Sequence, residues 1–138
     1  MPNSEIKPIK TSDTLAIRQQ VMWPNRDISY VKLPEDAQGL HYGLFVDEIL
    51  ISVVSLFDTK NGWQFRKFAT LQEQQGKGYG SKLLSYVIAI AERANASSIY
   101  CNARVEKVNF YRGFGLETTT KTFVKGGVSY VVMEKRAS

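Results

Sequence analysis

The chain has 138 residues, of which 43% are hydrophobic and 22% are charged, ordinary proportions for a globular protein that buries a core. Its net charge of +5 comes from scattered lysines and arginines, so a nucleic-acid-binding arm is not expected. The single cysteine, Cys101, excludes an internal disulfide bond and a zinc site built on several thiolates. The sequence shows neither the apolar core of a signal peptide nor a stretch long enough to span a bilayer, which predicts one cytoplasmic domain over residues 1–138 without membrane association.

The first forty residues predict a strand, a helix and a long loop. Residues 4–10 alternate apolar and polar side chains, a pattern typical of an edge strand, where proline is tolerated. Residues 11–23 have the apolar spacing of a helix, capped by Thr11 or Ser12 and ended by the following proline. Residues 25–38 are polar and contain proline, so we expect an ordered loop, with or without a short helix.

Three strands joined by tight turns are expected next. Residues 40–46 and 49–57 are rich in β-branched and aromatic side chains, and only Asp47-Glu48 separates them, which is the length of a two-residue hairpin loop. Asn61-Gly62, a strong turn signal, precedes a third strand over residues 63–71. These three strands therefore predict an antiparallel meander.

The second half of the chain alternates helices and strands. A helix over about residues 78–95 is apolar on most sides and should be largely buried. Residues 97–103 follow as a strand, and the intervening helix implies that this strand pairs in parallel. A short helix over residues 106–112 and strands over 116–123 and 128–135 complete the chain. The order β-α-β-β-β-α-β-α-β-β predicts an α/β fold with a mixed sheet.

Three glycines alternate with other residues in GKGYG, residues 76–80, where a strand gives way to the long helix. Unpaired N–H groups meet the positive end of the helix dipole there without intervening side chains, which favours a bound phosphate. The Walker pattern requires Gly-Lys-Ser/Thr and fails at Gly78, and the dinucleotide fingerprint would need a glycine at Ser81. A tight turn without a ligand is the remaining alternative, although one glycine would suffice for it.

A third phosphate-binding pattern fits the segment better. Gln75-Gly76-Lys77-Gly78-Tyr79-Gly80 resembles the Arg/Gln-x-x-Gly-x-Gly/Ala signature of the GNAT superfamily of N-acetyltransferases. The preceding FRKFATLQEQ, residues 65–74, is similar to the strand and loop that lead into that signature. Downstream, NFYRGFGL resembles the family's Phe-Tyr-x-x-x-Gly-Phe segment, with Leu116 in place of the final Phe. The order of elements also matches the family over nearly the whole chain.

This resemblance implies a GNAT-like α/β fold, in which helices flank a mixed, mostly antiparallel sheet with a splayed parallel strand pair at the CoA site. It also implies that the loop holds the CoA pyrophosphate and that the pantetheine arm lies along the fourth strand like an added strand. The residues so implied in binding acetyl-CoA are Phe68, Ala69, Thr70, Gln75, Gly76, Lys77, Gly78, Tyr79, Gly80, Ser81 and Asn102. A solvated Lys77 and a helix-capping Asn102 are the alternatives at those two positions.

For catalysis, Tyr111 resembles the family tyrosine that donates a proton to the CoA sulfur, and packing of its ring in the core is the alternative. Residues 64–67 hold no carboxylate where family members often place a base. Glu73 is expected at the surface and His41 as a satisfied strand histidine, so a water relay is the default base. Cys101 is expected to be a small buried residue, which favours direct attack over an acyl-enzyme.

The resemblance predicts acetyl transfer from acetyl-CoA to an amine of a small molecule or peptide, without a metal. Basic residues in loop 23–38, with Arg66 and Arg104, suggest an acceptor that carries a carboxylate. Lys107 and Ser129-Tyr130 depart from the family pattern and leave the acceptor undetermined. A catalytically silent acyl-CoA sensor and a basic nucleic-acid binder are the competing functions, of which scattered charge disfavours the second. Edge strands at the C-terminal end would allow a homodimer.

Overall fold

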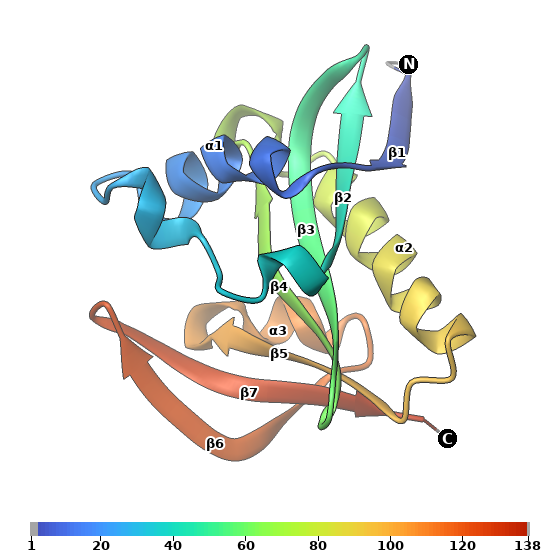
Figure 1. Ribbon diagram of the computed structural model, residues 1–138. Coiled ribbons are helices and arrows are strands. Elements are labelled where there is room, and N and C mark those ends of the chain that lie inside the picture. Colours follow the sequence, from blue (N-terminus) through green and yellow to red (C-terminus); the bar gives the residue numbers. More distant parts are fainter. Residues whose placement is uncertain (1–2, 138) are drawn as a thin grey trace.

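In the computed structural model, residues 3–137 are described, and they form one mixed seven-stranded sheet with helices on both faces (Figure 1). The strands run in the order β1-β2-β3-β4-β5-β7-β6. Their bounds are Ser4–Pro8 for β1, Leu40–Val46 for β2, Ile49–Thr59 for β3, Gly62–Thr70 for β4, Ser98–Arg104 for β5, Glu117–Lys125 for β6 and Val128–Arg136 for β7. The α-helices are α1 (Thr11–Met22), α2 (Tyr79–Arg93) and α3 (Val108–Arg112). The predicted fold class and order of elements are therefore confirmed.

Element ends differ from the predictions by a few residues, and the local chemistry accounts for some of the differences. Helix α1 takes Lys10 as its N-cap instead of Thr11 or Ser12, because the Asp13 carboxylate accepts a hydrogen bond from the Lys10 N–H at 3.0 Å. The loop that follows α1 is ordered and contains two 3-10 helices, Ile28–Val31 and Asp36–Gln38.

The hairpin between β2 and β3 has the predicted two-residue loop. Asp47 and Glu48 have φ angles of 48° and 70°, the left-handed pair that a type I′ turn requires and that matches the twist of the flanking strands. The two following strands, β3 and β4, are also antiparallel. The predicted meander of three strands is confirmed.

Alternate residues of the central strands bury opposite faces of the sheet. Ile17 of α1 packs against Val53 and Ala69 on one face. On the other face, a larger cluster joins α2 to the sheet and includes Leu44, Val54, Leu56, Phe65, Leu83, Leu84, Val87, Ala91, Ile99, Cys101 and Met133. Because α2 is buried along one broad stripe, it holds the loop before it in a set position relative to β4.

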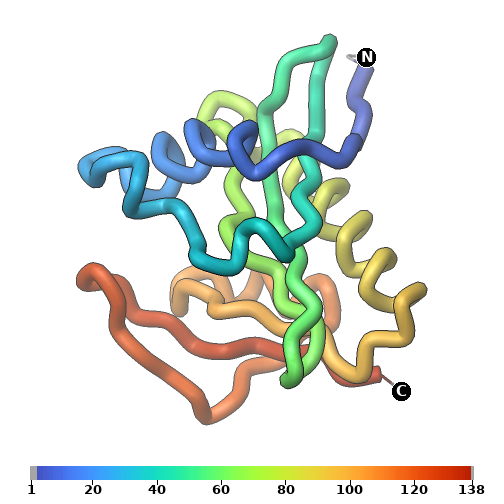
Figure 2. The backbone as a smooth tube through the Cα atoms, in the orientation of Figure 1, coloured from blue at the N-terminus to red at the C-terminus, as the bar shows by residue number. Residues whose placement is uncertain are grey.

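Strands β4 and β5 form the parallel pair, and they separate soon after they meet. Their pairing is limited to Trp63 with Ile99 and Gln64 with Tyr100, and Figure 2 shows the two traces diverging from this end. A bulge in β4 then sets two residues, Lys67 and Phe68, against one residue of β3. Lys67 takes a φ of 55° in this bulge. The splayed parallel pair predicted from the resemblance is confirmed.

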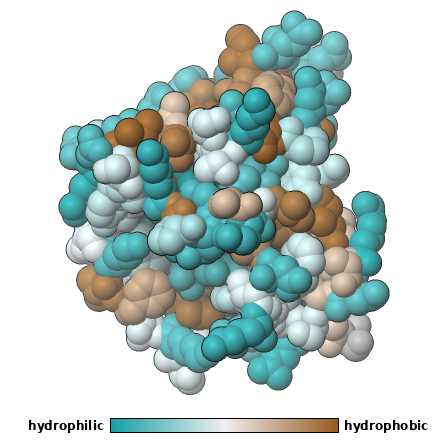
Figure 3. Space-filling model, in the orientation of Figure 1, coloured by the Kyte–Doolittle hydropathy of each residue, from teal (hydrophilic) through white to brown (hydrophobic). Residues whose placement is uncertain are grey.

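The outer surface shows no single apolar face in the view of Figure 3, where brown groups are small and lie among polar side chains. Among residues 3–137, every helix is too short or too polar to cross a membrane. Strand β6, at one edge of the sheet, is largely exposed. Pairing of this edge between protomers stays a prediction.

Candidate active site

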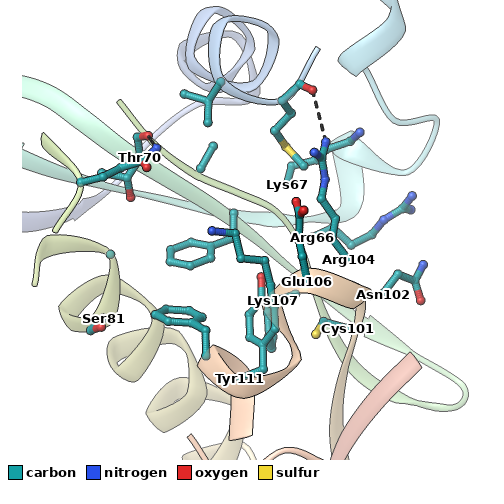
Figure 4. A pocket seen from close by; sticks show the side chains of 18 of the residues that line it. Arg66, Lys67, Thr70, Ser81, Cys101, Asn102, Arg104, Glu106, Lys107 and Tyr111 are labelled. Atoms are coloured by element: carbon teal, nitrogen blue, oxygen red, sulfur yellow. Dashed lines mark hydrogen bonds between the residues drawn. The ribbon is translucent and has the colours of Figure 1, made fainter. Parts of the chain in front are cut away.

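A cavity of about 580 Å³ opens between the diverging strands β4 and β5. The end of α1, the start of α2 and helix α3 complete its wall. Of the residues predicted to bind acetyl-CoA or to act on it, the wall contains Phe68, Ala69, Thr70, Gln75, Gly76, Gly78, Gly80, Ser81, Asn102 and Tyr111. In Figure 4, Thr70 and Ser81 lie toward one end of the cavity and Asn102 toward the other, with Tyr111 between them.

Two of the predicted residues lie outside this wall. The Lys77 ammonium donates to the Gln74 side chain at 3.3 Å on the exposed side of the loop. The Tyr79 ring packs partly buried against the larger core cluster. The sequence pattern locates the loop but does not tell which of its side chains turn away from the cavity.

The backbone of the glycine loop has the geometry of an anion cradle. Gly76 and Gly78 have φ angles of 78° and 86°, and a Cβ built at either one would meet nothing within 4 Å. Gly78 is also the N-cap of α2 and supplies no side-chain hydrogen bond to the helix. The first N–H groups of α2 thus lie beside open space at the positive end of the helix dipole, an arrangement that suits an anion.

Position 80 favours a glycine for a different reason, which is lack of space for a side chain. A Cβ at this position would lie 3.1 Å from both the Phe68 ring and the Thr70 hydroxyl. The first turn of α2 thus packs directly on the end of β4. The Gln75 side chain reinforces this junction, because its amide donates to the Thr70 carbonyl at 2.9 Å.

Tyr111 lies on the α3 side of the cavity and packs against Phe65 of β4, with ring centroids 5.8 Å apart. Burial raises the pKa of the Tyr111 phenol above its ordinary value, and the nearby Cys101 adds to this effect. The phenol is therefore protonated at neutral pH and able to donate a hydrogen bond into the cavity. Both readings of Tyr111, as a packed ring and as a donor, are compatible with this position.

The comparisons with known proteins agree with this geometry. The model of the acetyltransferase (GNAT) domain family matches residues 23–137. This chain belongs to the GNAT acetyltransferase family. It is 29% identical to an uncharacterized N-acetyltransferase of Bacillus subtilis (strain 168), YitI, over 95% of each chain.

Solved GNAT structures share the fold and include forms with the co-substrate bound. A Bacillus subtilis acetyltransferase in complex with CoA has a TM-score of 0.75 and 15% identity, covering all of both chains. A GNAT acetyltransferase from Elizabethkingia anophelis with acetyl-CoA bound has a TM-score of 0.74 and 14% identity, over 98% of this chain and 99% of that one. As a GNAT protein, this chain is an acyltransferase whose co-substrate is an acyl-CoA. Within residues 3–137, no His, Cys, Asp or Glu cluster is arranged to hold a metal ion.

The GNAT cavity also contains charged residues that sequence reasoning did not assign to it. Two of these residues are Lys67 and Glu106. The wall also includes Lys107, Arg66 and Arg104. The Arg66 guanidinium pairs with the Glu35 carboxylate at 2.8 Å. The Arg104 guanidinium donates to the Met22 carbonyl at 3.2 Å, the bond that is dashed in Figure 4. No sequence signal marked Lys67, because its position depends on a bulge that only the pairing with β3 creates.

His41 does not reach this cavity. One of its ring nitrogens lies 2.6 Å from the Ser55 hydroxyl and the other lies 2.8 Å from the Asp36 carbonyl. The ring therefore joins a buried polar network, which agrees with the prediction of a satisfied strand histidine. Glu73 lies exposed in a short 3-10 helix before the glycine loop.

Proposed function

We propose that this protein transfers an acetyl group from acetyl-CoA to an amine of a small molecule or peptide by direct attack of the amine. The observation that carries the proposal is one cavity that joins three parts: the glycine loop, the open edge of β4 and the Tyr111 phenol. Each part suits a different portion of acetyl-CoA. Their order along the cavity matches the order of pyrophosphate, pantetheine and thioester.

For binding, the backbone N–H groups from Gly76 to Ser81 would hold the pyrophosphate, where Gly76 and Gly78 leave room for it. The backbone of Phe68, Ala69 and Thr70 would hydrogen-bond the pantetheine amides, since β4 has separated from β5 by this point. We expect Lys77 and Tyr79 to contribute through the loop backbone only, because their side chains lie outside the cavity. Asn102 would contact acetyl-CoA or the acceptor from β5.

The acceptor must first lose a proton, because a primary ammonium with a pKa of about 10.4 has no lone pair for attack. We propose that water in the cavity takes this proton. Among residues 3–137, Glu106 is the one carboxylate on the cavity wall, and such a water would pass the proton to it. The neutral amine then attacks the thioester carbon, and the C–S bond breaks to release the CoA thiolate.

Tyr111 would serve the departing sulfur. Because burial keeps its phenol protonated, it can donate a hydrogen bond to the thiolate as negative charge develops there. A thiol is a stronger acid than this phenol, so Tyr111 alone does not protonate the CoA thiolate. A proton that the amine loses is relayed to the sulfur instead, and the products are the N-acetyl amine and CoA-SH.

Direct attack is favoured over an acyl-enzyme because of the state of Cys101. Its side chain lines the cavity, but burial raises its pKa to about 12. Only a minute fraction is thiolate at neutral pH, and the thiolate is the nucleophile. The acetyl group therefore passes to the amine in one transfer.

The decisive experiment is turnover of acetyl-CoA with a broad panel of amines, followed by release of the CoA thiol. Amine-dependent thiol release, with the N-acetyl product found by mass spectrometry, supports the proposal. Acetyl-CoA that stabilises the protein against thermal unfolding without thiol release across the panel would favour the acyl-CoA sensor instead. Binding to DNA or RNA that weakens steeply with salt would favour the nucleic-acid binder.

A further inference from the structure

Lys67 occupies an unusual position for a cation. It sits in the bulge of β4 at a left-handed φ of 55° and lines the cavity. Its side chain is only partly exposed, and among residues 3–137 no carboxylate lies within ion-pair distance of its ammonium. Burial lowers its pKa to about 8, and repulsion from Lys125 and Arg66 adds to this.

Few charged groups act on Lys67, and most of them are positive. Besides Arg66 on its own strand, they are Lys125 at the end of β6, Arg18 of α1 and Asp36 of the loop. Only Asp36 is negative, and Arg18 already binds it through both carboxylate oxygens at 2.9 Å. The residues of the glycine loop do not contribute. The charges nearest Lys67 are therefore mostly positive, and Lys67 lies with Arg66 and Arg104 at the end of the cavity away from Thr70 and Ser81 (Figure 4).

The loop after α1 and the turn between β6 and β7 meet beside Arg104 of the cavity wall. A Cβ at Gly126, in the turn between β6 and β7, would lie 2.7 Å from the Trp23 ring and 3.1 Å from the Tyr30 hydroxyl. Arg104 stacks over Trp23, with its guanidinium 5.3 Å from the ring centre. Among residues 3–137, the wall of the cavity holds four cations, Arg66, Lys67, Arg104 and Lys107, and one carboxylate, Glu106.

We infer that the acceptor carries a negatively charged group beside its amine, and that the Lys67 ammonium binds this group. An anion is the partner that a partly buried, unpaired ammonium lacks, and a carboxylate or phosphonate would supply it. Arg66 and Arg104 flank the position, but Glu35 and the Met22 carbonyl already bind them. Lys107, the remaining cation on the wall, is exposed to solvent and is not desolvated as Lys67 is. Lys67 is therefore the specificity-determining cation. The inference rests on the proposed transfer to an amine and narrows its substrate class.

The test uses pairs of amines in which one member carries an anionic group and the other a neutral group in its place. Each common amino acid is compared with its amide, and 2-aminoethylphosphonate with ethanolamine, as acceptors for acetyl-CoA. We expect the anionic member to have a kcat/KM at least ~10-fold higher, the difference that one charged hydrogen bond makes. Lys67→Met should abolish this preference, Lys67→Arg should retain most of it, and the KM for acetyl-CoA should stay unchanged.

Lys60→Met is the matched control, since it removes the same charge from an exposed turn between β3 and β4. A preference that persists in Lys67→Met would overturn the inference, and so would a native preference for the neutral member. An equal fall in kcat for both members would make Lys67 a base instead. If no amine is acetylated, calorimetry with CoA-saturated protein tests binding alone. Binding of the anionic amines that depends on Lys67 would support the inference even though the proposed transfer fails. No such binding would overturn both the inference and the proposed function.

Discussion

The molecule contains two groups of buried or partly buried charges, and their partners differ. Under the loop after α1, the fully buried Arg18 binds the Asp36 carboxylate, the Ser55 hydroxyl and the Val31 carbonyl, each at 2.9 to 3.0 Å. His41 contacts the same Ser55 hydroxyl. On the central strand β4, Lys67 lines the cavity without a carboxylate of its own.

This contrast separates a structural role from a binding role. Charges whose partners come from the protein hold one segment to another, here the loop to α1 and β3. A charge that is desolvated without a partner weakens the fold and has its partner in the ligand. The first group should therefore control stability, and the second should control substrate choice. Five predictions test this division and the cavity on which the second group lies.

The largest expected effect is on stability, from Arg18→Met. Removal of one member of a buried ion pair leaves the Asp36 carboxylate without its partner, which should lower the free energy of unfolding by about 3–5 kcal/mol. Denaturant unfolding monitored by circular dichroism measures this change. The double variant Arg18→Met/Asp36→Leu should recover a large part of the loss, because it leaves no uncompensated charge.

The same pair predicts a pH dependence. Burial by itself would raise the pKa of Asp36, but hydrogen bonds from Arg18 and the Leu33 N–H hold it below the ordinary 3.8. The stabilisation by this carboxylate is thus complete above the unfolded pKa and is lost as the pH falls through the lower, folded value. The difference in stability between native and Asp36→Asn should be constant from pH 5 to 7 and shrink below about 4. A difference that grows on acidification would contradict the assignment.

The next effect concerns co-substrate binding. In Gly78→Leu, the new side chain would occupy the open space at the start of α2, and CoA should bind ~100-fold more weakly or worse, a loss of about 2.7 kcal/mol. Titration calorimetry measures this affinity. Gly127→Leu is the matched control, because Gly127 has a similar φ of 79° and equally open surroundings in the β6–β7 turn. Equal loss of CoA binding in both variants would attribute the effect to backbone strain and not to the loop.

A smaller effect is expected from Tyr111→Phe, which keeps the ring against Phe65 and removes the hydroxyl. If the phenol donates to the leaving sulfur, kcat should fall between ~10- and ~100-fold with little change in CoA affinity or stability. Steady-state kinetics beside a thermal melt separates these quantities. A parallel fall in stability and CoA affinity would show that Tyr111 acts by packing.

The smallest effect has the opposite sign. Lys67→Met should raise the free energy of unfolding at pH 7 by about 1 kcal/mol, because it removes a poorly solvated charge. The gain is small because the side chain keeps some contact with solvent, which weakens the effect of its pKa shift on stability. The folded pKa of about 8 lies below the ordinary 10.5, so the native protein gains stability as the pH rises from 8 to 10.5. The advantage of Lys67→Met should disappear over that window. A variant less stable than the native protein at pH 7 would place Lys67 in the structural group.

Much of the fold followed from local patterns. The Asp47-Glu48 turn, the meander and the long helix were predicted nearly in full because hairpin loop length and apolar periodicity are properties of neighbouring residues. The glycine loop and Tyr111 were also singled out, through two motifs that resemble those of the family. These two features lie on the same cavity.

The features that sequence reasoning missed depend on residues far apart in the chain. In the sequence, Arg18 is simply a polar residue of a helix. In the structure it is fully buried, because Asp36 of a loop and Ser55 of a strand bind it. The role of Gly80 depends on the approach of Phe68. Neither relation has a local signature, since the contacts form only when the sheet assembles.

By itself, the sequence determined the order of elements, the family and the class of co-substrate, because turn residues, apolar periodicity and the spacing of glycines in a loop are features of short stretches of chain. Only the tertiary structure decided which charges are paired. The separation of β4 from β5 opens the cavity, and the bulge in β4 carries Lys67 into it. We propose that the choice of acceptor depends on that difference, because an ammonium that has no partner within the protein is free to bind an anionic ligand.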